Sequence, residues 1–278
     1  MSKLPTSTGW LWIKQGFALF RKQPGGLSTL FIGYMLATIL LSMVPVAGQF
    51  MPVVLVPVFS IAFMQACADI DQNKRVLPKL LLAGFRQPAF KVLFALGTLY
   101  LAAFALAIAV SALADDGVLF KLLAGQLETD SAQAREANLG GAFLLALAVY
   151  LPVAMAFCFA APLIYWQRMS LGKAVFFSFF AVLRALRAFA AFALGWFTIC
   201  MTVALTVALL CGGSDTARLV MLPLSIIMTV VINCSFYASY RQIFGVPQDE
   251  APAAPPPVSG PPVAEPPESD PPESGPSA

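Results

Sequence analysis

Long apolar stretches, separated by short polar segments, dominate the chain. Residues 24–68 contain no Asp, Glu, Lys or Arg, a run of 45 residues. This is about twice the roughly 20 apolar residues needed to cross a hydrocarbon core about 30 Å thick. Pro45 and Gly48 supply turn residues in the middle of the run. The same reasoning along the whole chain predicts six membrane-spanning helices, at about 26–44, 48–68, 92–113, 140–165, 188–211 and 219–240.

Three shorter segments, 9–23, 76–88 and 171–187, are too polar to span a membrane and too apolar for ordinary loops. In the first, apolar side chains recur at helical spacing while Lys14 and Arg21 lie on another side. Such a pattern predicts an amphipathic helix on the membrane surface, with aromatic rings among the lipid headgroups and cations towards anionic lipid. The residues that we expect to contact headgroups are Trp10, Trp12, Lys14, Arg21, Lys22, Arg86, Arg184 and Arg187.

These segments also raise the question of an internal repeat. FRKQP at 20–24 and FRQP at 85–88 are alike, and each precedes a predicted membrane helix. One interpretation is a duplicated unit, made of a surface helix followed by a helical hairpin. The other is the general tendency of basic residues to precede membrane helices on one side. Residues 1–25 do not fit a signal peptide, because Lys14, Arg21 and Lys22 interrupt the apolar positions.

Basic residues are distributed unequally between the two sides of the predicted spans. If the N-terminus is cytoplasmic, 14 of the 17 Lys and Arg residues fall on the cytoplasmic side. The largest outer loop, 114–139, is instead mainly acidic. An excess of Lys and Arg in short loops marks the cytoplasmic side of a membrane protein. The charge distribution therefore predicts that both termini are cytoplasmic.

The composition supports a membrane protein and restricts its chemistry. Of the 278 residues, 59% are hydrophobic and 11% are charged, whereas an average soluble domain has about 25% charged residues. Histidine, the commonest general acid or base and metal ligand, is absent. No charged residue lies deep in a predicted span, which disfavours an ion-coupled pump. We therefore expect no enzymatic activity, no cofactor, no metal site and no nucleic-acid partner.

Two sets of polar residues at four-residue spacing stand out in the last two predicted spans. If these spans form an antiparallel hairpin, the two sets lie at matching depths, so we expect their faces to touch. The functional alternative is a polar lining for a substrate path, while the simpler interpretation is helix packing. The residues concerned are Thr198, Thr202 and Thr206 in one span and Ser225, Thr229 and Asn233 in the other.

All five cysteines fall within or at the ends of predicted spans, and no two have the spacing of a metal-binding pair. We expect them to be small buried hydrophobic residues. An alternative for Cys67 and Cys234, which lie near the predicted cytoplasmic side, is acylation.

The C-terminal tail differs from the rest of the chain. Residues 247–278 contain 12 of the 22 prolines and six acidic residues but no basic one. Such a composition does not bury a core and predicts disorder. The tail is either a solvating spacer or a docking segment for a protein partner. The chain thus divides into a surface helix (1–25), a six-helix membrane domain (26–245) and a tail (246–278).

Two sequence motifs resemble those of a known family. They are GWLWIKQGFALFRKQP at 9–24 and FAAPLIYWQRMSLGKAVFFSFFAVLRA at 159–185. The resemblance is to an uncharacterised family of betaproteobacterial multi-pass inner-membrane proteins, and more distantly to the membrane domains that accompany glycerophosphodiester phosphodiesterases. It covers about residues 8–243 and implies an inner-membrane helical bundle without an established activity. The family usually has Arg-Asn where this chain has Arg184-Ala185.

The functional interpretation that follows is a non-enzymatic, membrane-embedded interaction or envelope-organising protein. Its surface helices would contact membrane lipids. The alternative is an uncoupled transporter or exporter of an apolar or lipid-like molecule. A water-accessible cavity lined by Thr202, Thr229 and Asn233 would favour transport, whereas a closed bundle would favour the interaction role.

Overall fold

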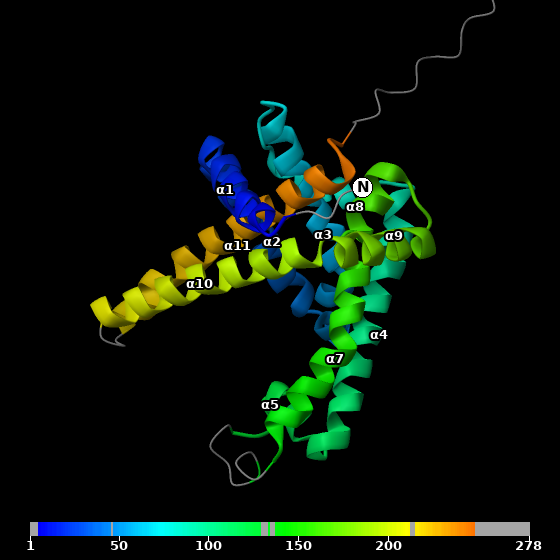
Figure 1. The fold of residues 1–278 in the computed structure, drawn as a ribbon, viewed down its shortest axis with the longest axis vertical. Helices are drawn as coiled ribbons and strands as arrows, with labels where there is room; N and C mark the ends of the chain where they lie inside the picture. The colour runs from blue at the N-terminus through cyan, green and yellow to red at the C-terminus, as the bar shows by residue number, and fades with distance from the viewer. Residues whose placement is uncertain (1–4, 46, 129–132, 134–136, 212–214, 248–278) are drawn as a thin grey trace, which may run out of the picture. The chain divides into compact units, whose positions relative to one another are not determined.

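A computed structural model describes residues 5–45, 47–128, 133, 137–211 and 215–247. The predicted disordered tail from residue 248 onwards and parts of the predicted outer loop 114–139 therefore lie outside the described residues. The described part of the chain is all-α, as predicted (Figure 1). Its elements are α1 (Ser7–Lys22), α2 (Pro24–Ser42), α3 (Ala47–Asp71), the 3₁₀ helix η1 (Pro78–Phe85), α4 (Ala89–Asp115), α5 (Val118–Leu123), α7 (Leu139–Phe157), α8 (Ala160–Gln167), α9 (Leu171–Arg184), α10 (Leu186–Cys211) and α11 (Asp215–Phe244).

The six predicted spans are confirmed as helices that are long and apolar enough to cross a membrane. Each overlaps its predicted range and extends a few residues beyond it at one or both ends. Within the described residues they are Pro24–Ser42, Phe50–Asp71, Ala89–Asp115, Leu139–Gln167, Leu186–Cys211 and Thr216–Phe244. The positions of the long uncharged stretches thus determine where the helices lie, because the length of each stretch must match the thickness of the hydrocarbon core.

The fourth span is not one continuous helix. It consists of α7 and α8, which are separated at Cys158 and Phe159. Pro162 has no N–H to donate to the carbonyl of Cys158, one turn earlier, which favours a break here. Alone, α7 has 19 residues and a length of about 28 Å, close to the hydrocarbon thickness. The eight residues of α8 therefore add length beyond what one crossing of the hydrocarbon core needs.

Ser178 of α9 bridges the break between α7 and α8. Its hydroxyl accepts a hydrogen bond from the N–H of Phe159 at 2.8 Å and donates one to the carbonyl of Met155 at 3.0 Å. These two backbone groups are separated by four residues and would bond to each other in a continuous α-helix. The Ser178 side chain is thus inserted into the backbone ladder and fixes the position of α9 against the fourth span.

We expect Ser178→Ala to lower the free energy of unfolding by about 1–3 kcal/mol. The substitution leaves the backbone N–H of Phe159 and the carbonyl of Met155 without the bridging hydroxyl in a buried site. Thermal unfolding of the purified protein in detergent measures the effect. The matched control is Ser225→Ala, because the exposed Ser225 bonds only to its own helix; it is expected to change stability by less than about 0.5 kcal/mol. Equal effects of the two substitutions would contradict a bridging role.

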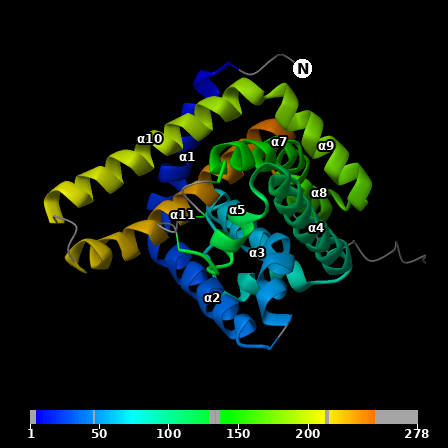
Figure 2. The ribbon, with the colours of Figure 1, turned by 90° about the horizontal axis from the view of Figure 1, so that it is seen from below.

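The packed core lies towards one end of the bundle. At this end α2, α4 and α10 begin and α3, α8 and α11 end, and we call it the basic end. The largest fully buried side chains include Trp12, Phe159, Tyr237 and Tyr240, all near it. Away from it, the α10–α11 hairpin and the α4–α7 pair diverge (Figures 1 and 2). Side chains at the far ends are correspondingly open; Leu113 and Leu209 are 82% and 84% exposed.

The central span is α3. In an 18-residue apolar stretch of α3, 67% of the residues are buried, whereas only 11% are buried in the corresponding stretch of α10. The outer spans therefore present most of their apolar surface to the surroundings. A Cβ atom at Gly97 of α4 would collide with the backbone carbonyl of Val54 in α3. Glycine there lets the two helices approach to backbone contact, which is a common way for membrane helices to pack.

Candidate functional site at the basic end

All three predicted surface segments are helical and lie next to the basic end. The first is α1 and the third is α9, both α-helices, whereas the second contains the shorter 3₁₀ helix η1. Each immediately precedes, or is one short turn away from, the start of a span. That these helices lie in the headgroup layer stays a prediction.

One face of α1 packs against α10 and α11. Trp12 is fully buried, its Nε1 donates a hydrogen bond to Oε1 of Gln242 at 2.6 Å, and its ring lies 5.1 Å from that of Phe189. Ile13 is also buried, and Gly16 lies directly against the backbone of Ser235. The expectation that Trp12 contacts headgroups is therefore wrong. Trp10 and Trp12 are separated by roughly 200° around a helix, so only one of them can face outwards.

The opposite face of α1 is open and mixes apolar and basic residues. Trp10 is 48% exposed, and Leu11, Lys14, Arg21 and Lys22 are exposed beside it. Rings and cations interleaved in this way are typical of helices at a membrane interface.

The same division occurs in α9. Ala174, Ser178 and Val182 are buried against the spans. The outer face combines exposed phenylalanine rings with Lys173 and Arg184, and Arg187 follows in the first turn of α10. Arg86, just after η1, is exposed as well.

A polar network, which the sequence patterns did not single out, joins the spans at this end. Arg241 Nη1 donates to both carboxylate oxygens of Asp71, at 2.7 and 2.6 Å, and thereby links α11 to α3. In parallel, Trp166 Nε1 donates to Gln65 Oε1 at 2.9 Å, linking α8 to α3. The sequence feature that could have indicated this network is the position of Asp71 and Arg241, because each is a charged residue near the end of an apolar span.

Most cations at the basic end have no acidic partner. Of the described residues, ten exposed cations here form neither an ion pair nor a hydrogen bond. They are Lys14, Arg21, Lys22, Arg75, Lys79, Arg86, Lys91, Lys173, Arg184 and Arg187. A cluster of unpaired positive charge produces a field that attracts anions.

The two polar ladders do not touch, so that prediction is wrong. Thr198, Thr202 and Thr206 are exposed, and each hydroxyl donates to the carbonyl four residues earlier in α10. Instead, α10 buries Trp196 and Val207. Thr229 and Asn233 likewise bond within α11. The hydroxyl groups satisfy their own helix and leave packing to apolar side chains.

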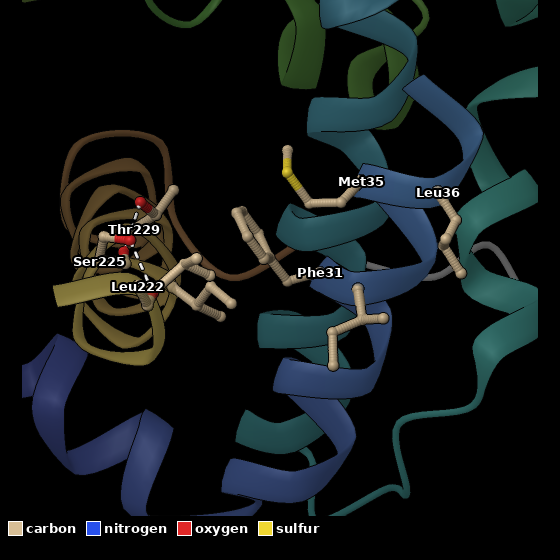
Figure 3. A pocket seen from close by; sticks show the side chains of 8 residues that line it. Phe31, Met35, Leu36, Leu222, Ser225 and Thr229 are labelled. Carbon is tan, nitrogen blue, oxygen red and sulfur yellow. Dashed lines mark hydrogen bonds between the residues drawn. The ribbon is translucent and has the colours of Figure 1, made fainter. Parts of the chain in front are cut away.

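Ser225 and Thr229 face α2 rather than α10. They line an open groove of about 390 Å³ between α11 and α2, together with apolar side chains that include Phe31, Met35 and Leu222 (Figure 3). Of the six ladder residues, this groove contains Ser225 and Thr229, and its other walls are hydrocarbon side chains.

The cysteines divide into buried and open positions. Cys67 of α3 and Cys234 of α11 are fully buried with their sulfur atoms 3.4 Å apart. Acylation of either is therefore the wrong interpretation, because no acyl donor can reach them. Cys200 is exposed, contrary to the expectation that all five are buried. No group of three metal-ligating side chains occurs in the part of the chain that the structure describes.

The contact between Cys67 and Cys234 allows a direct test of helix packing. In a chain with the other three cysteines replaced by alanine, mild oxidation with copper phenanthroline is expected to join the two residues within one molecule. Mass spectrometry of the digested protein would detect the linked peptides from α3 and α11. The control replaces Cys234 with serine and introduces Val230→Cys, one turn away. Equal linkage in both proteins would contradict the close approach of the two sulfur atoms.

Comparison with known proteins finds a relative that is described as an inner membrane protein. No family model matches the chain, and no solved structure matches it. A probable inner membrane protein of Burkholderia thailandensis is 40% identical to it over an alignment 263 residues long, which covers 91% of this chain and 97% of that protein.

Proposed function

The chain belongs to the same family as this Burkholderia thailandensis inner membrane protein, and from that premise we propose a non-enzymatic interaction or envelope-organising role in the inner membrane. It is a multi-pass membrane protein with six apolar helices among its described residues. The observation that carries the proposal is the surface at the basic end, where exposed rings and unpaired cations lie together. Such a surface fits lipid headgroups.

The polar groups near this surface support a structural rather than a catalytic use. Asp71, Arg241, Gln65 and Trp166 are occupied with one another. The distant similarity to membrane domains that accompany glycerophosphodiester phosphodiesterases belongs to the same proposal. In this proposal the tail is the candidate docking segment for a protein partner.

The proposal includes an orientation with both termini in the cytoplasm. The ten unpaired cations would then face the cytoplasm, in agreement with the positive-inside rule. Fusing green fluorescent protein to the C-terminus should give fluorescence, and inserting alkaline phosphatase after Gly125 should give phosphatase activity. A dark C-terminal fusion with an inactive loop fusion would overturn the orientation.

The interaction role is tested by crosslinking and co-purification of the intact protein from its membrane. We expect a reproducible protein partner that is lost when the six tail acids, Asp249, Glu250, Glu265, Glu268, Asp270 and Glu273, are replaced by glutamine. An identical set of partners in both proteins would remove the tail from the proposal. Uptake or release of a lipid-like molecule by reconstituted vesicles, with no partner captured, would instead favour the transporter alternative.

A further inference from the structure

The orientation of α9 is fixed by its buried side. Ala174 and Ser178 are completely inaccessible, Val182 is nearly so, and Ser178 is hydrogen-bonded to the backbone at the α7–α8 break. The helix therefore cannot rotate to bury its other face without breaking these bonds. Whatever the outer face carries is presented permanently to the surroundings.

The outer face carries an aromatic patch made of Phe176, Phe177, Phe179 and Phe180. Phe176 is 58% exposed and Phe177 49% exposed. The rings contact one another, with centroids 4.6 Å apart for Phe176 and Phe180 and 5.4 Å apart for Phe179 and Phe180. A contiguous exposed apolar patch of this kind marks a surface that enters a membrane or meets a partner.

Cations flank the aromatic patch along one stripe of the helix. Lys173, Phe177, Phe180 and Arg184 follow one another at spacings of four, three and four residues, which places them on the same side of α9. Arg187 follows in the first turn of α10. Over the length of α9, Lys173 and Arg184 lie about 16 Å apart. All three cations are exposed and have no carboxylate partner among the described residues.

We propose that the outer face of α9 binds anionic phospholipids, with Lys173, Arg184 and Arg187 on the phosphate groups and the phenylalanine rings between the acyl chains. The inference rests on the proposed function, because it assigns the lipid class that the basic end selects. Because α9 leads directly into the span α10, a bilayer around the spans would lie close to this face, and rings and positive charge would be satisfied there together. An acidic protein would satisfy the cations but would also have to cover the rings.

The probe is the full-length protein in nanodiscs containing phosphatidylcholine and phosphatidylglycerol in a ratio of 4:1. Native mass spectrometry counts the lipids of each class that stay bound. We expect phosphatidylglycerol to be enriched around the protein, and the triple variant Lys173→Gln/Arg184→Gln/Arg187→Gln to reduce that enrichment by about threefold to tenfold. Arg184→Lys/Arg187→Lys, which keeps the charge, should retain it.

The matched control removes the same charge elsewhere on the basic end. Arg75→Gln/Lys79→Gln/Lys91→Gln alters three exposed, unpaired cations outside α9 and should leave most of the enrichment in place. An equal loss in both triple variants would overturn the α9 site in favour of the general positive field. No enrichment in the unaltered protein would overturn lipid selection altogether, while the co-purification result for the interaction role would be unaffected by either outcome.

The aromatic part of the proposal has its own readout. Replacing Phe176 and Phe180 by serine removes two rings but no charge. The variant should lose phosphatidylglycerol and phosphatidylcholine contacts alike at α9, detected as reduced crosslinking of α9 peptides to lipids that carry a photoreactive acyl chain. Unchanged acyl crosslinking to these peptides would contradict insertion of the rings, and capture of an acidic protein by the unaltered face would identify the other occupant.

Discussion

Trp12→Ala is expected to lower the free energy of unfolding by about 3–5 kcal/mol and to loosen α1 from the bundle. The indole is fully buried, lies against the rings of Phe189 and Phe192, and is the hydrogen-bond donor to Gln242. Alanine leaves a large cavity between α1, α10 and α11 and removes the partner of the Gln242 side chain. Because Gln242 is itself exposed and its amide can bond to water instead, the expected loss of stability comes mainly from the cavity.

The buried thiols of Cys67 and Cys234 report this change directly. In a chain with the other three cysteines replaced by alanine, the rate of labelling by a fluorescent maleimide rises when the core opens. The control is Trp10→Ala, which removes an exposed indole from the other side of the same helix and should change stability by about 0.5 kcal/mol or less. Trp12→Phe, which keeps a ring but loses the hydrogen bond, should fall between the two. Similar labelling for the Trp10 and Trp12 variants would contradict the docking of α1.

Gly97→Leu is expected to destabilise the protein by about 3 kcal/mol or more, because it forces α3 and α4 apart. A Cβ atom at this position would already collide with the Val54 carbonyl, and backbone atoms cannot move aside as the end of a flexible side chain can. The midpoint of thermal unfolding, followed by circular dichroism in detergent, measures the loss.

Gly140→Leu is the matched control for this substitution. Gly140 lies at the start of α7, and a Cβ atom there would meet nothing within 4 Å. The same added side chain should therefore be tolerated with a change of about 0.5 kcal/mol or less. Loss of stability in the control but not at Gly97 would show that the α3–α4 contact is looser than its geometry indicates.

The positions of the spans could be predicted from the sequence because they depend on a length. A helix must be apolar over the thickness of the bilayer, and charged residues mark where that stretch ends. The rotation of each helix about its axis has no such signal, since lipid and protein interior are both apolar. The four-residue spacing of Thr198, Thr202 and Thr206 therefore predicts a polar face against α11, whereas α10 packs with Trp196 and Val207.

For the candidate site, the sequence predicts which single residues are charged and exposed, but it does not predict which residues contact each other across the fold. The exposed cations Lys14, Arg21 and Arg184 could be placed from charge alone. The ion pair between Asp71 and Arg241 joins residues 170 positions apart, and the Ser178 bridge depends on a helix break that Pro162 permits without fixing its partner. Both require the relative placement of helices, which local sequence patterns do not contain.

The docking of α1 has a consequence for how the protein is made. The buried face of α1 is synthesised well before the surfaces of α10 and α11 that cover it, and Trp12 bonds to a residue 230 positions later. At about 5–20 residues per second, the nascent α1 waits for roughly 10–50 s before Gln242 is synthesised. During that interval the apolar side chains of Trp12 and Ile13 lack the helices that bury them in the finished protein, so the native position of α1 is reached only after α10 and α11 are made.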